Sequence, residues 1–97
     1  MEKKRLKVVL VDDHAMIRDG IAAMLEREYA CVVVAEAENG IDAARLISES
    51  DADLAIMDLG LPGKNGMDVL DDIRARGVMM PVIIFTMNKN PETFKRI

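Results

Sequence analysis

The sequence predicts an α/β fold in which a doubly wound parallel sheet carries helices on both of its faces. Short, nearly continuous apolar runs alternate with segments whose apolar residues recur at helical spacing. The apolar runs are rich in β-branched residues, as expected for strands that are buried on both faces. Because every connection between strands is helical and crossovers of this kind are right-handed, the strands are expected to run parallel.

The first strand is expected at residues 6–11, where an apolar run leads directly into Asp12 and Asp13. From residue 15 to residue 28 the pattern changes to a helical period. Residues 31–35 are again apolar and β-branched, which predicts the second strand. The apolar face of the intervening helix is predicted to consist of Ile17, Ile21, Met24 and Leu25.

A second amphipathic helix follows the break at Asn39 and Gly40. The third strand is expected at residues 53–58, and glycine and proline then predict a loop at residues 60–66. The apolar positions of the second helix are Ile41, Ala43, Ala44, Leu46 and Ile47.

The third helix ends at Gly77, a residue type that often terminates helices. Pro81 opens a fourth strand at residues 82–86, because proline is tolerated at the first position of a strand. Asn90 is then expected to cap a further helix, with Pro91 at its first position. The third helix is predicted to be lined by Met67, Leu70 and Ile73.

Composition limits the class of protein. The 97 residues make one small domain at most, and a content of 51% hydrophobic and 31% charged residues is typical of a folded globular protein. The net charge of −4 gives no general attraction for nucleic acid, so the basic run within residues 1–7 is interpreted as a solvated lead-in to the first strand. No apolar run approaches the ~18 residues of a membrane span. We therefore expect a cytoplasmic protein, with the single cysteine, Cys31, as a small buried hydrophobic residue.

Acidic residues stand where two of the predicted strands end. Asp12 and Asp13 follow the first strand, and Asp58 ends the third. In the flavodoxin-like strand order 2-1-3-4-5 these two strands are neighbours, and their carboxyl ends meet where such sheets bind ligands. Clustered carboxylates raise one another's pKa unless a cation lies among them. Their oxygens suit Mg²⁺ or Mn²⁺, which predicts a metal site, although caps on the following helix are an alternative for Asp13 and His14.

Asp58 is the candidate nucleophile of this pocket. A carboxylate beside a divalent cation can accept a phosphoryl group as an aspartyl phosphate. Thr86 ends the fourth predicted strand at the same edge, and its hydroxyl would be placed to donate to a phosphoryl oxygen. The alternative for Thr86 is an ordinary β-branched strand residue.

Taken together, these segments resemble the receiver domain of bacterial two-component response regulators over essentially the whole chain. The Asp-Asp-His opening and the Phe-Thr-Met end of the fourth strand resemble the NarL/FixJ (LuxR-type) subgroup most. The similarity is carried by Val11-Asp12-Asp13-His14, Met57-Asp58-Leu59-Gly60-Leu61-Pro62-Gly63, Gly66, and Ile83-Ile84-Phe85-Thr86-Met87.

The resemblance implies a CheY-like fold and a role for each residue of the pocket. Asp58 would accept phosphate from a histidine kinase, and Thr86 would be the switch hydroxyl. Asp12 and Asp13 would hold Mg²⁺, with Asp58 and the backbone carbonyl of Gly60 as further ligands. The resemblance implies that residues 1–97 form a single receiver domain. DNA would be contacted only through a separate output domain outside these residues.

The chain departs from this family after the fourth helix. Receivers continue into a fifth strand that ends in lysine and then a fifth helix, so the sequence is expected to be a receiver truncated before strand five. Lys64, Lys89 and Lys95 are not assigned to the missing role. A bare edge on the fourth strand predicts a homodimer or a domain-swapped oligomer through that edge, unless the chain is a fragment of a longer protein.

Three alternatives complete the interpretation. The first is a degenerate receiver that binds partner proteins without phosphorylation, which the missing lysine favours. The second is a nucleotide-binding enzyme, but Asp58 stands where a phosphate-binding loop needs its first glycine, and Asn65 stands where it needs serine or threonine. The third concerns His14, which is interpreted as a residue of the helix start and not as a base or ligand, because no second histidine or cysteine cluster accompanies it.

Overall fold

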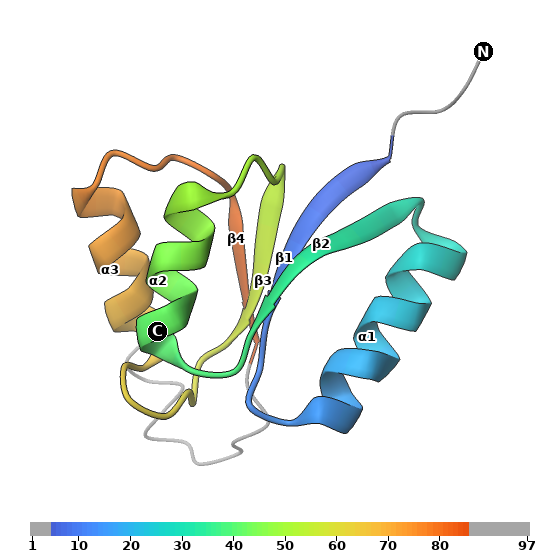
Figure 1. The fold of residues 1–97 in the computed structure, drawn as a ribbon, viewed down its shortest axis with the longest axis horizontal. Coiled ribbons are helices and arrows are strands. Elements are labelled where there is room, and N and C mark those ends of the chain that lie inside the picture. The colour runs from blue at the N-terminus through green and yellow to red at the C-terminus, as the bar shows by residue number, and fades with distance from the viewer. Residues whose placement is uncertain (1–4, 86–97) are drawn as a thin grey trace.

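The computed structural model describes residues 5–85, and within them a four-stranded parallel sheet carries helices on both faces (Figure 1). The strand order is β2-β1-β3-β4, which confirms the predicted order for the strands described. The elements are β1 (Leu6–Val11), α1 (Ala15–Glu28), β2 (Cys31–Ala37), α2 (Gly40–Glu49), β3 (Leu54–Asp58), α3 (Gly66–Ala75) and β4 (Val82–Phe85). Thr86 and the helix predicted from Asn90 lie outside the described residues.

The two faces of the sheet are covered unequally. The helices α2 and α3 pack together on one face, and α1 lies on the other (Figure 1). The larger cluster of buried residues lies on the α2–α3 face and includes Val9, Met57 and Ile73. The smaller cluster contains Val8, Leu25 and Cys31, so the cysteine is a buried hydrophobic residue as predicted.

Two predicted core positions are wrong. Met24 is 38% exposed, because α1 is the single helix on its face among residues 5–85 and buries little beyond Leu25. Ile41 is 66% exposed; it lies in the first turn of α2, where its side chain is beside the turn at Gly63. Val69, which the sequence interpretation passed over, is fully buried on α3.

Several element ends differ from the sequence prediction by one or two residues. Strand β2 continues to Ala37, because the register with β1 shifts after Val8 and both Glu36 and Ala37 still pair with β1. Helix α2 begins at Gly40, because the side chain of Asn39 accepts a hydrogen bond from the N–H of Asp42 at 2.8 Å.

The third strand and the third helix are displaced by one residue at their starts. Strand β3 begins at Leu54 and not at residue 53, and α3 begins at Gly66 and not at residue 67. The side chain of Asn65 caps α3 by accepting from the N–H of Asp68 at 2.9 Å. Gly77 follows α3 with a φ of 84°, the left-handed conformation in which glycine ends helices.

Candidate functional site

The site lies where β1 and β3 end side by side. The two strands are parallel neighbours, and Val11 pairs with Met57. Asp12 and Asp58, the next residue on each chain segment, are therefore placed next to each other at the carboxyl edge of the sheet. Both are buried, with 0% and 4% of their surface exposed. A buried carboxylate is costly unless it is paired, so this arrangement requires a compensating group.

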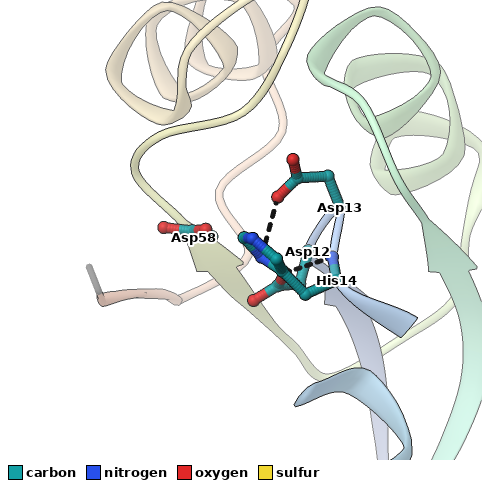
Figure 2. A group of neighbouring side chains, drawn as sticks. All are labelled: Asp12, Asp13, His14 and Asp58. Carbon is teal, nitrogen blue, oxygen red and sulfur yellow. Dashed lines mark hydrogen bonds and ion pairs between the residues drawn. The ribbon is translucent and has the colours of Figure 1, made fainter. Parts of the chain in front are cut away.

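The structure brings together the three predicted aspartates and adds His14. One ligand atom from each of Asp12, Asp13, His14 and Asp58 lies within 4.8 Å of all the others. The imidazole lies among the carboxylates, with its Nδ1 atom 2.8 Å from Oδ1 of Asp12 and 3.0 Å from Oδ1 of Asp13 (Figure 2). Side chains from two separate strand ends therefore form one cluster.

His14 occupies the N-cap position of α1 but makes no side-chain capping hydrogen bond. Its ring is turned instead toward Asp12 and Asp13, so the interpretation of His14 as a helix-start residue describes its backbone alone. The neighbouring Asp12 also contacts His14, because its Oδ1 atom accepts a hydrogen bond from the N–H of His14 at 2.7 Å.

Burial and neighbouring charge perturb the two titratable groups at the centre of the site. Burial raises the pKa of the Asp58 carboxyl, and the charges of Asp12 and Asp13 raise it further against the lowering effect of the Gly60 N–H and of His14. The hydrogen bond to Asp12 and the charge of Asp13 raise the pKa of His14. The expected repulsion within the acidic cluster is thus present at Asp58.

The carboxylate of Asp12 provides a test of whether the residues fit a cation. Its Oδ1 atom is bonded to His14, whereas its Oδ2 atom is buried and has no hydrogen-bond partner among residues 5–85. A buried polar atom without a partner calls for a bound ion or water. Three carboxylates with one free buried oxygen are the hard oxygen donors that Mg²⁺ and Mn²⁺ prefer, so the residues fit such a cation.

Arg18 supports the site from α1, and the sequence analysis assigned it no role in the site. Its guanidinium donates to the backbone carbonyl of Asp12 at 2.6 Å and to Glu36 at 3.1 Å. The side chain is 17% exposed and joins the end of β1 to the end of β2. No spacing rule in the sequence indicates this contact, because it depends on the register between the two strands.

The loop between β3 and α3 fixes Asp58 from the other side. The N–H of Gly60 donates to Oδ1 of Asp58 at 3.1 Å. Gly66 lies so close that a Cβ atom there would be 2.9 Å from the carbonyl oxygen of Asp58.

Lys64, in the same loop, is 2.7 Å from Asp72, and this hydrogen bond lowers the pKa of Asp72. The ammonium group of Lys64 is therefore bound to a carboxylate of α3. The predicted role of the Gly60 carbonyl stays a prediction.

No helix within residues 5–85 is both long enough and apolar enough to cross a membrane.

The chain is similar to known signalling proteins. The family of response regulator receiver domains matches residues 8–97. The nitrate/nitrite response regulator proteins NarL and NarP of Escherichia coli (strain K12) are 33% identical over 85 residues and 37% identical over 87 residues. These matches cover 88% and 90% of this chain but 39% and 40% of the relatives. The chain thus spans about two fifths of the length of these curated relatives.

Solved structures give the same result for the fold. A two-component response regulator of the LuxR family from Aurantimonas sp. SI85-9A1 has a TM-score of 0.84 at 34% identity, with 96% of this chain and 66% of that chain covered. A DNA-binding response regulator of the LuxR family from Staphylococcus aureus has a TM-score of 0.84 at 30% identity, with 94% and 76% covered. The sheet order and the helices described above therefore agree with those of LuxR-family receivers.

Proposed function

Because the chain belongs to the family of response regulator receiver domains, we propose that it is the phosphoryl-accepting switch of a two-component system, with Asp58 as the acceptor and a histidine kinase as the donor. Asp12 and Asp13 hold Mg²⁺ (or Mn²⁺), and Asp58 and the carbonyl of Gly60 complete the protein ligands. Thr86 supplies the switch hydroxyl. The reaction changes the state of the chain itself, so the protein is a switch more than a turnover enzyme.

The observation that carries this proposal is the difference in environment between the paired aspartates. Asp12 is fully buried and bonded through Oδ1 to His14. Asp58 accepts one hydrogen bond, from the N–H of Gly60, within the described part of the chain. A nucleophile needs an oxygen that the phosphoryl donor can reach. The Oδ2 atom of Asp12, which has no hydrogen-bond partner within residues 5–85, is buried in a residue with 0% exposed surface, whereas Asp58 keeps 4% of its surface exposed.

The chemistry assigned to the residues is a single displacement. An Asp58 carboxylate oxygen attacks the phosphorus of the donor phosphohistidine, a P–O bond forms, and the P–N bond breaks with its electron pair left on the donor imidazole. A bound divalent cation supplies neutralisation of the negative charge that gathers on the phosphoryl oxygens. The Gly60 N–H orients the Asp58 carboxylate, and Arg18 holds the backbone that carries Asp12.

The output is proposed from the relatives. They are response regulators of the nitrate/nitrite type, and the solved neighbours include a DNA-binding member of the LuxR family. We infer that phosphorylation of this chain in the cytoplasm controls transcription, and that DNA is contacted through a separate output domain. The residues described above identify neither the histidine kinase nor the DNA sequence that the output domain would bind.

A beryllofluoride titration in the presence of Mg²⁺ tests the proposal. Beryllofluoride adds to an aspartate as a stable mimic of a phosphoryl group, so a protein-bound fluorine NMR signal should appear that requires both Mg²⁺ and Asp58. The matched control is Asp19→Asn, which removes an exposed carboxylate of α1 outside the site. If the wild-type chain gives no bound signal while its folded spectrum is intact, the alternative holds, and the domain is a phosphorylation-independent interaction module.

The outer edge of β4 supports a second element of the proposal, a homodimer or domain-swapped oligomer. Within residues 5–85 β4 pairs with β3 alone, and Ile83 is 56% exposed. An apolar strand with a free edge tends to pair with another chain. Light scattering should give a mass above that of the monomer, and a single monomeric mass at high concentration would overturn this element.

A further inference from the structure

His14 gives the metal pocket a donor that a magnesium site does not need. It is the single histidine of the sequence, and its Nδ1 atom contacts the carboxylates of both Asp12 and Asp13. Mg²⁺ prefers oxygen ligands in a near-ideal octahedron, and imidazole is a ligand for Zn²⁺, Cu²⁺, Ni²⁺ and iron. The donors gathered here are therefore a mixed set of one nitrogen and three carboxylates.

We propose that the pocket also binds a divalent transition metal of the zinc type, with His14 as its nitrogen ligand beside Asp12, Asp13 and Asp58. Four protein donors match the four-coordinate preference of Zn²⁺, which accepts both imidazole and carboxylate ligands. His14 thereby determines which metal the site accepts, a role distinct from holding Mg²⁺.

The geometry of the cluster supports this ligand set. Bonds of about 2.0–2.1 Å in a tetrahedral zinc site place neighbouring ligand atoms about 3.3 Å apart. The separations of 2.8 Å and 3.0 Å between His14 and the two carboxylates are near that value, and all four donors already lie within 4.8 Å of one another. The two pairs that include His14 therefore lie near the required spacing, and zinc would draw the other donors together from separations of at most 4.8 Å.

An independent observation points to a bound cation at the same place. Oδ2 of Asp12 is buried without a hydrogen-bond partner among residues 5–85, while Oδ1 is held by the N–H and the ring of His14. The free oxygen and the imidazole thus belong to two residues, Asp12 and His14, that already contact each other. Cys31, the other side chain suited to zinc, begins β2 at the opposite edge of the sheet and is buried there.

Sharing of ligands has a consequence for signalling. Because Asp12, Asp13 and Asp58 would serve both metals, Zn²⁺ and Mg²⁺ should compete for the pocket. If the proposed function holds, zinc would also occupy the carboxylate that accepts the phosphoryl group and would inhibit phosphorylation. Zinc binding itself rests on the cluster geometry, so it can be tested without any phosphoryl donor.

Calorimetric titration of the 97-residue chain with Zn²⁺ and, separately, with Mg²⁺ tests the inference. His14→Gln keeps a hydrogen-bond donor and removes the imidazole. We expect it to weaken zinc binding by at least about tenfold, the lower bound for losing even an outer-shell partner, while the affinity for Mg²⁺ changes little. Asp12→Asn should weaken binding of both metals, and Cys31→Ala should weaken neither.

A second measurement uses the wild-type chain alone, so it does not depend on the folding of a variant. Because His14 is the single histidine, its imidazole NMR resonances report on metal ligation without ambiguity. They should shift strongly with Zn²⁺ and only slightly with Mg²⁺. Equal zinc affinity in the wild type and His14→Gln, or imidazole resonances that do not respond to zinc, would overturn the inference. A failure of beryllofluoride binding would instead count against the proposed function alone.

Discussion

The ends of β1 and β3 carry the same residue type side by side and hold it in different ways. Asp12 has no exposed surface, and its Oδ1 is bonded to the N–H and the ring of His14. Asp58 is bonded at Oδ1 to the N–H of Gly60, and its pKa is raised chiefly by burial. Within residues 5–85, the first aspartate is held by two contacts with His14, and the second is held by one backbone N–H. We infer from this difference that Asp12 binds the metal and Asp58 accepts the phosphoryl group.

The segments that follow the two strands explain the difference. Residues 12–14 lead from β1 directly into α1, so the helix start folds back onto Asp12. Residues 59–65 form a longer loop before α3 and leave the Asp58 carboxylate facing the pocket. The two aspartates thus differ in environment because the connection to the following helix is short after β1 and longer after β3.

Removal of each carboxylate should give the largest effects and separate the two roles. Asp58→Asn should abolish phosphoryl acceptance from acetyl phosphate, because the nucleophilic oxygen is lost, and it should retain measurable Mg²⁺ binding. Asp12→Asn should weaken Mg²⁺ binding by at least about tenfold and reduce phosphorylation only as far as the metal is lost. Intact-protein mass and metal titration measure the two effects.

The comparison would break if these variants behaved alike. Phosphoryl incorporation that survives in Asp58→Asn, or Mg²⁺ binding that is unaffected in Asp12→Asn, would show that the assigned roles are wrong. Circular dichroism of each variant serves as the control for folding.

The close approach of Gly66 to the end of β3 predicts the next largest effect. Gly66→Ala should destabilise the fold by about 1–3 kcal/mol, because the added methyl group would crowd the carbonyl of Asp58 and Cα of Leu59. Gly20→Ala is the matched control in the middle of α1, where no neighbouring atom lies within 4 Å of the new Cβ. It should stabilise the protein by about 0.5–1 kcal/mol.

Urea unfolding of both glycine variants gives the measurement. Gly66→Ala should lower the free energy of unfolding, and Gly20→Ala should raise it. A Gly66→Ala protein as stable as the wild type would show that the loop at residues 59–65 can move away without loss of stability. The close approach of Gly66 would then not be what positions Asp58.

The pKa of Asp58 predicts a dependence of stability on pH in metal-free protein. The folded-state pKa is raised above the ordinary value of 3.8, so the folded state binds the proton more tightly than the unfolded state does. The contribution of Asp58 to stability is therefore present at low pH and is lost as the pH rises from about 3.8 through the raised folded value. Asp58→Asn should lack this component, and Mg²⁺ should offset it.

Denaturant unfolding of the wild type and Asp58→Asn across pH 3–7 checks this sign, because the difference between the two proteins isolates the group. A wild-type stability that rises relative to Asp58→Asn with increasing pH, in the absence of metal, would contradict the direction of the pKa shift.

The smallest effect is expected at Lys64. Because its ammonium group is held by Asp72 of α3, Lys64→Gln should lower thermal stability by less than Gly66→Ala and leave the extent of phosphorylation unchanged. Arg76→Gln, which removes the other cation beside Asp72, is the matched variant. A strong loss of phosphoryl acceptance in Lys64→Gln alone would instead assign Lys64 to the phosphoryl group.

Much of the fold could be predicted because its elements are punctuated locally. The bounds of β1 and α1 agree with the prediction, and Gly77 follows the end of α3 in a left-handed turn as its residue type indicates. The starts of α2 and α3 differ by one residue, because the side chains of Asn39 and Asn65 cap them. The length of β2 could not be predicted, because the register shift after Val8 depends on pairing with β1 and not on the sequence of β2 itself.

The candidate site shows the same division between local and long-range information. The adjacency of Asp12 and Asp58 could be predicted from the flavodoxin-like strand order, in which the first and third strands are neighbours. The contacts of Arg18 with the Asp12 carbonyl and Glu36, and the turn of His14 toward the carboxylates, follow from how a helix start sits over neighbouring strands. No local pattern encodes that placement.

The central claim is that Asp58, and not its neighbour Asp12, accepts the phosphoryl group. Its most direct test is peptide mass mapping of the chain after incubation with acetyl phosphate and Mg²⁺, with the acyl phosphate trapped by borohydride reduction. The account predicts that the modification lies on the peptide containing Asp58 and disappears when Mg²⁺ is chelated. Modification at Asp12 or Asp13, or none in folded, magnesium-bound protein, would contradict it.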